Sequence, residues 1–136
     1  VQGAKALFTS ADVPGLIYDV LFVSPESLTT NREEWQKVVK VWFRIVDYMN
    51  DPTNKEEMLK ILSARVQITP EEYAPFLAGT KILTHDENKA RFAKGDGLDT
   101  VHGSSKIVND FNVANKVYEK PEDVGAYFDD SLVNAQ

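Results

Sequence analysis

The chain has 136 residues, of which 43% are hydrophobic and 26% charged, with a formal net charge of −6 and no cysteine. This length suits a single domain, or a fragment of one, over residues 1–136, and the composition is that of an ordinary globular protein. The negative charge argues against a nucleic-acid or anionic-membrane partner, and the lack of cysteine excludes disulfides, thiol nucleophiles and cysteine-ligated metals.

The first part of the chain contains the only stretch that is typical of β-strands. Two short apolar runs, residues 4–8 and 16–23, flank a polar break that ends in a Pro-Gly turn signal. The second run contains the sequence VLFV, which is β-branched and aromatic and suits a strand buried on both faces. The sequence therefore predicts a strand–loop–strand over residues 1–28.

Helical patterns fill the rest of the chain, residues 29–136. The strongest one predicts a helix over residues 31–50, where apolar side chains recur every three or four positions and form one stripe. The stripe consists of Trp35, Val38, Val39, Trp42, Ile45, Val46 and Met49. Thr69 and Thr84 each precede a glutamate by three residues, which predicts capping boxes at two further helix starts. The chain is thus expected to be helix-rich α/β, with two strands and then five or six helices, the last of them over residues 124–133.

A succession of short motifs supports a more specific interpretation. They are LFTSAD (7–12), PGLIYDVLFV (14–23), PESL (25–28), DYM (47–49), NDF (109–111), PED (121–123) and DSLV (130–133). Their order resembles the C-terminal half of the substrate-binding proteins of bacterial ATP-binding-cassette importers for nitrate, sulfonates, taurine and thiamine-precursor pyrimidines. The resemblance covers essentially the whole chain.

The resemblance implies part of a type II periplasmic-binding fold, in which two α/β lobes close on a solute through hinge strands. Residues 4–8 would be the tail of the second lobe, and residues 16–23 would be a hinge strand. The function implied is non-enzymatic capture of a small polar solute without a cofactor. The implied partners are a membrane permease and either a missing N-terminal lobe or a second copy of the chain.

The same resemblance implies a periplasmic or extracellular location, with the protein either soluble or anchored by a lipid. The sequence itself contains neither an apolar run near the roughly 20 residues that span a bilayer nor a signal-peptide pattern at its start.

Four polar residues of the first 28 are the predicted ligand-binding side chains. Thr9, Ser10 and Asp12 lie where the resemblance places the cleft-facing end of a strand, and their groups can hydrogen-bond an oxyanion or an amine. The alternative is an ordinary turn whose side chains bond their own backbone. Asp19 lies inside the second apolar run, so it either faces inward, where it needs a partner or ligand, or faces solvent at a strand end.

The other candidate sites have weaker support. The two histidines, His85 and His102, have no ligand-like spacing, so neither a metal site nor a catalytic constellation is expected. The spacing of Trp35 and Trp42 is typical of a core stripe. Another hypothesis from a different class remains open, in which the apolar face of helix 31–50 makes the chain a helical protein-interaction module; a small enzyme is a third.

Overall fold

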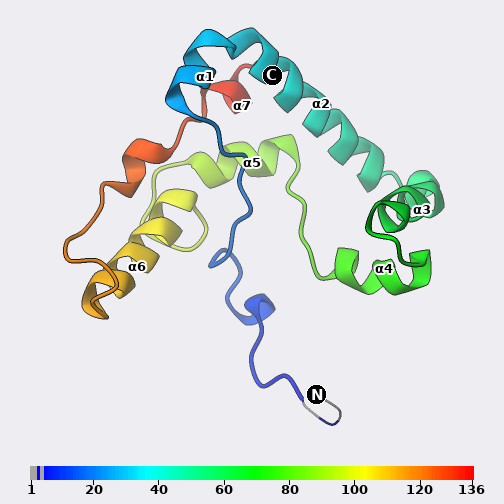
Figure 1. Cartoon of the computed structure of the whole chain (residues 1–136), viewed down its shortest axis with the longest axis horizontal. Coiled ribbons are helices and arrows are strands. Elements are labelled where there is room, and N and C mark those ends of the chain that lie inside the picture. Colours follow the sequence, from blue (N-terminus) through cyan, green and yellow to red (C-terminus); the bar gives the residue numbers. More distant parts are fainter. Residues whose placement is uncertain (1–2, 4) are drawn as a thin grey trace.

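The computed structural model describes residues 3 and 5–136, and these residues form helices joined by loops (Figure 1). The elements in chain order, with η for a short 3-10 helix, are η1 (Ser10–Asp12), α1 (Pro25–Thr30), α2 (Arg32–Asn50), η2 (Pro52–Asn54), α3 (Lys55–Val66), α4 (Pro70–Ala78), α5 (His85–Phe92), α6 (Val101–Ala114), η3 (Val124–Tyr127) and α7 (Ser131–Asn134). Helices α3 and α4 lie at one end of an arch and α6 at the other, while α2, α5 and α7 form its middle (Figure 1).

The expected α/β fold with two hinge strands is wrong for this chain. The described residues contain no β-strand, which does not fit a type II periplasmic-binding fold. Residues 17–23 run as an open segment, and no backbone hydrogen bond joins them to another described part of the chain. A β-strand requires a neighbouring strand to pair its backbone groups, and the part of the chain that the structure describes offers none to this segment. Of the other expected strand, residue 4 lies outside the described residues and residues 5–8 form no regular element.

The predicted long helix is confirmed as α2, but its buried face differs from the predicted stripe. The side chains that face the core are Val39, Phe43 and Val46, at spacings of four and three residues. Phe43 was absent from the predicted stripe and is only 8% exposed, whereas Trp42 of that stripe is 50% exposed. The core therefore lies about one helical position away from the stripe that the sequence predicted.

Helix α7 completes this core although it is only four residues long. Leu132 and Val133 are buried against Val39 and Phe43. The Nε2 of His85 lies 2.8 Å from the carbonyl oxygen of Val133, and because a carbonyl can only accept, Nε2 donates this hydrogen bond. The His85 ring centroid is 4.8 Å from that of Phe43. The C-terminal end of the chain is thus fixed between α2 and α5.

Both predicted capping boxes are confirmed. Thr69 Oγ1 accepts from the backbone N–H of Glu72, and a Glu72 carboxylate oxygen accepts in return from the N–H of Thr69. Thr84 and Glu87 form the same pair of bonds at the start of α5. These bonds satisfy N–H groups that have no partner inside the helix, and this explains why α4 and α5 begin where they do.

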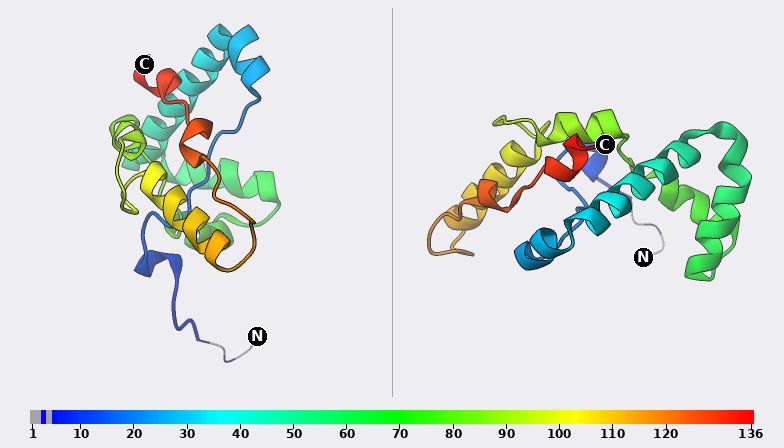
Figure 2. Two further views of the ribbon diagram at one scale, coloured as in Figure 1. Left: turned by 90° about the vertical axis from the view of Figure 1, so that its left-hand side faces the viewer. Right: turned by 90° about the horizontal axis from the view of Figure 1, so that it is seen from above.

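The predicted helix over residues 124–133 is interrupted. It is divided into η3 and α7, because residues 128–130 are not helical. An Asp129 carboxylate oxygen accepts from the backbone N–H of Ser131 at 2.8 Å and also from its hydroxyl. This local bonding offers the backbone an alternative to a continuous helix. The interruption lets α7 turn toward α2, as the view from above shows (Figure 2).

A pair of phenylalanine substitutions tests the position of the core. Phe43→Ala is expected to lower the free energy of unfolding by about 3 kcal/mol or more, because it leaves a cavity between α2, α5 and α7. Phe76→Ala is the matched control: Phe76 is 68% exposed on α4, so its loss should cost about 0.5 kcal/mol or less. Urea denaturation followed by circular dichroism measures both. Equal losses for the two variants would contradict this core.

Candidate functional site

Thr9, Ser10 and Asp12 lie together on one exposed turn, η1. A carboxylate oxygen of Asp12 accepts from the Thr9 backbone N–H at 2.7 Å and from the Thr9 hydroxyl at 3.1 Å. The alternative of an ordinary, self-bonded turn therefore describes Thr9 and Asp12. The side chains of this turn are nonetheless exposed, and the Ser10 hydroxyl bonds to no other described side chain or backbone group.

Asp19 is exposed, so the solvent-facing alternative describes its position. No hydrogen bond or ion pair within the described residues joins Asp19 to the turn of Thr9 and Asp12. The structure thus groups three of the four predicted ligand-binding residues and leaves the fourth apart from them.

The segment after this turn is apolar and largely uncovered. Ile17 is 71% exposed and Phe22 is 88% exposed, and Val20 and Leu21 are also mostly exposed. One point of the segment is held: the Tyr18 hydroxyl donates to the carbonyl oxygen of Leu98 at 2.9 Å. Beyond that point, the segment presents both apolar side chains and unpaired backbone groups.

A groove lies between this segment and α6. It has a volume of about 330 Å³, and its lining comes from residues 16–20, α6, the turn after α6 and the η3 region. Four lining residues of α6, Val101, Ser105, Val108 and Asn112, recur every three or four positions and so share one face of the helix.

Two close contacts hold loops against α6, the first of them beside the groove. The side-chain amide of Asn109 donates to the carbonyl oxygen of Glu122 at 3.1 Å and accepts from the Glu122 N–H at 3.3 Å, which holds the 119–123 loop on α6. At the other end of α6, a side chain at Gly103 would collide with the backbone of Asp96 and Gly97. The glycine therefore allows the 95–97 loop to pack directly on the helix.

The pKa shifts with a clear cause belong to helix caps and surface pairs. The Lys81 ammonium and the Thr84 N–H hydrogen-bond the Glu87 carboxylate and lower its pKa. Bonds from Thr69 lower the pKa of Glu72 in the same way. The hydrogen bond with Glu57 raises the pKa of the Tyr48 hydroxyl. These groups stabilise local structure, and none of them lies on η1 or in the groove.

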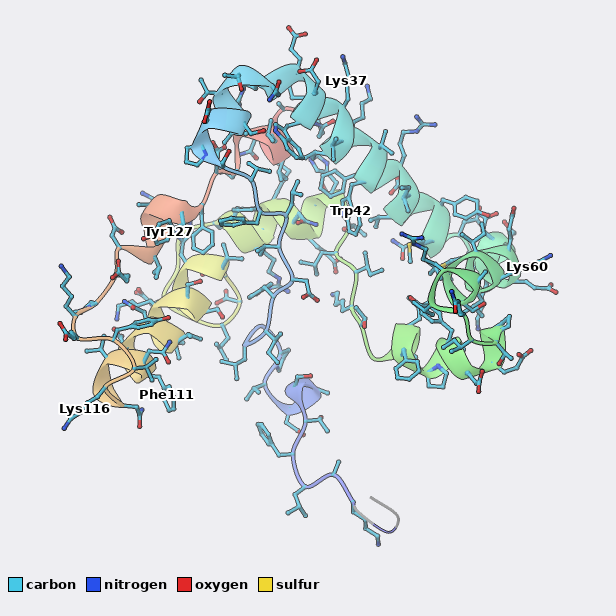
Figure 3. All side chains as sticks on the ribbon, viewed as in Figure 1. Lys37, Trp42, Lys60, Phe111, Lys116 and Tyr127 are labelled. Carbon is cyan, nitrogen blue, oxygen red and sulfur yellow. The ribbon has the colours of Figure 1, made fainter. Side chains whose placement is uncertain are left out.

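The tryptophans and histidines considered in the sequence analysis pack against neighbouring side chains or face solvent, and in the part of the chain that the structure describes they form no ligand site. Trp35 is half-buried against the core and donates from Nε1 to the Ser27 hydroxyl at 3.0 Å, which agrees with its predicted core role. Trp42, which Figure 3 labels on α2, is half exposed. The His102 ring packs edge-on against Phe128, with centroids 5.1 Å apart. Within the described residues, no group of three or more His, Asp or Glu side chains could hold a metal ion.

A comparison of the chain with known protein families, with curated proteins and with solved structures finds no match. Among the described residues, no helix combines the length and the apolar character needed to cross a membrane.

The groove was not predicted from the sequence. Its polar members on α6, Ser105 and Asn112, lie on the same helical face as Val101 and Val108, and this spacing was the available signal. Tyr18, Tyr118 and Phe128 are far apart in sequence, so only the folded chain brings them to the same place.

A glycine-to-alanine pair tests the close packing of the 95–97 loop on α6. Alanine normally stabilises a helix relative to glycine by about 1 kcal/mol, but Gly103→Ala is expected to destabilise by about 1–3 kcal/mol because of the backbone collision. Gly79→Ala is the control, since its new side chain would have no neighbour closer than 3.5 Å. Thermal denaturation measures both. A Gly103→Ala chain that is more stable than the unsubstituted one would contradict the packing.

Proposed function

We propose that this chain is part of the solute-binding component of a bacterial ATP-binding-cassette importer, which captures a small polar solute and presents it to a membrane permease outside the cytoplasm. The observation that carries the proposal is the exposed turn with Thr9, Ser10 and Asp12, followed directly by an open apolar segment. A polar loop next to a surface that other parts of an assembly can cover is a common setting for a ligand site. The motif succession described above supports the same class of protein.

The bonding of the turn favours a solute with an amino group. The Thr9 hydroxyl and N–H are both engaged by Asp12, so they are not free to donate to an anion. The exposed carboxylate of Asp12 repels nitrate but can accept from an ammonium or amino group, and the Ser10 hydroxyl can add a second hydrogen bond. Taurine and aminopyrimidines fit this chemistry better than nitrate does.

The exposed apolar segment, residues 16–23, supports the proposal that the chain works as part of a larger assembly. The side chains of Ile17, Leu21 and Phe22 are all mostly exposed, and a concentration of exposed apolar side chains marks a surface that a partner can cover. In the proposed function, another lobe of the natural protein or a second copy covers residues 16–23. Covering them would also enclose the neighbouring turn, so that closure and solute binding become coupled.

The second candidate function is a helical protein-interaction module, and one observation favours it. Val38, Val41, Trp42 and Ile45 are each about half exposed and form a second apolar stripe on α2 beside the buried one. Figure 3 shows Trp42 on the inner side of the arch and Lys37 on its outer side. A partner helix packed on this stripe would bury it.

Substitution of Asp12 tests the proposed solute site. In the full-length natural protein, taurine or an aminopyrimidine should raise the melting temperature, as a ligand that binds only the folded state does. Asp12→Asn should weaken that binding about tenfold or more, because a hydrogen bond to a charged group contributes about 1.5–3 kcal/mol. Asp47→Asn, which changes another exposed aspartate, on α2, is the matched control and should leave the affinity unchanged.

Two results would count against the proposal. One is the absence of any thermal shift with taurine, alkanesulfonates, nitrate and pyrimidines; the other is equal binding by the Asp12→Asn and Asp47→Asn variants. If no solute binds and Trp42→Ser converts an oligomer to a monomer in size-exclusion chromatography with light scattering, the interaction module is the better account.

A further inference from the structure

We propose that the groove between residues 16–20 and α6 is a second binding site, which takes a small, flat and uncharged aromatic amide. The volume of about 330 Å³ falls at the lower end of the range for small-molecule sites. The site is separate from the turn of Thr9 and Asp12, so the proposal does not depend on the function proposed above.

The charge of the groove indicates the charge of its ligand. All the lining residues are uncharged, although a quarter of the chain consists of charged residues. The nearest charged side chains on α6, Lys106 and Asp110, pair with each other at 2.6 Å and do not line the groove. An ionised ligand would leave its water shell without gaining an opposite charge, which is costly, so a neutral ligand is favoured.

The polar groups of the groove indicate an amide. Ser105 and Asn112 are half-buried on the groove face of α6, and Tyr118 lies at its rim. Their side chains make no hydrogen bond to any other described residue, so they offer hydroxyl and amide donors and acceptors. A carboxamide presents the complementary pair, one N–H₂ donor and one C=O acceptor, at a single planar end.

The apolar part of the groove indicates an aromatic ring. Tyr18, Tyr118 and Phe128 contribute three aromatic side chains from three separate parts of the chain, and Val108 and Val124 add aliphatic surface. Aromatic walls of this kind favour a flat ring, which can stack or pack edge-on.

Several hydrogen bonds hold the α6 side of the groove and Tyr18 in place before any ligand binds. Asn109 anchors the loop before η3 to α6, and the Asn112 carbonyl oxygen accepts from the Val117 N–H at 2.8 Å, which holds the turn that carries Tyr118. The Tyr18 hydroxyl bonds Leu98 on the opposite side. A pre-formed site loses less entropy on binding than a mobile one.

Three probes of nearly identical shape test the proposal: benzamide, benzoate and benzamidine, which are neutral, anionic and cationic. The ¹⁵N-labelled chain is titrated with each probe and followed by two-dimensional NMR. Benzamide at roughly millimolar concentration should shift the amides of residues 105, 108 and 112 in a saturable way. Benzoate and benzamidine should bind at least tenfold more weakly.

Asn112→Asp places one negative charge in the groove with almost no change of shape. The variant should reverse the ranking, with benzamidine now bound at least tenfold more tightly than benzamide. Asn115→Asp is the matched control: it adds the same charge near the same end of α6 but outside the groove lining, and it should keep the original ranking. Ser105→Leu, which fills the groove with a strong helix former, should abolish the benzamide shifts.

The proposal is overturned if benzamide shifts residues away from the groove or shifts none, or if the three probes bind equally. It is also overturned if Asn112→Asp and Asn115→Asp have the same effect. The NMR spectra report directly whether each variant is folded; should Asn112→Asp fail to fold, persistence of the benzamide shifts in Ser105→Leu decides against the site. Failure here leaves the Asp12 test unaffected, because neither the probes nor the variants involve that turn.

Discussion

The packing of Phe43 against α7 and His85 is the interaction on which the rest of the structure depends. It joins residues from the middle and the end of the chain, because Leu132 and Val133 are buried on the same α2 face as Val39 and Phe43. The two ends of the arch connect to this centre in different ways (Figures 1 and 2). Helix α6 packs on α5, whereas α3 and α4 pack mainly on each other and reach α2 through η2. Loss of the central contact would therefore release α7 and separate the two ends.

Local signals in the sequence predicted where helices begin, but they did not predict which side chains are buried in the folded chain. The bonds of Thr69 and Thr84 to glutamates three residues later depend only on nearby residues, so the capping boxes could be read directly. The buried face of α2 could not be predicted in this way. Trp42 and Phe43 are adjacent aromatic residues, and only the position of α7 decides which of the two is buried. The strand prediction for residues 16–23 failed for a related reason: apolar and β-branched composition favours a strand, but a strand also needs a partner.

The two candidate sites also differ in whether nearby residues or the folded chain define them. The polar turn at Thr9 and Asp12 was predicted, and the structure adds that the two residues bond each other. This bond is the reason why the solute proposed above carries an amino group. The groove beside α6 depends on Tyr18, Asn112 and Phe128, which approach only in the folded chain. Its polar helix residues, Ser105 and Asn112, share a helical face with Val101 and Val108, but this spacing alone does not show which other segments complete a groove.

The central claim is that a compact α2–α5–α7 core coexists with an open apolar segment whose backbone is unpaired. Residue-resolved amide hydrogen exchange on the intact chain tests it directly. Slow exchange is expected for the amides of Val39, Phe43 and Val46, which are buried and helical, and near-unprotected exchange for residues 19–22. Slow exchange at residues 19–22, comparable with that of α2, would mean that the segment is a paired strand and would contradict the account.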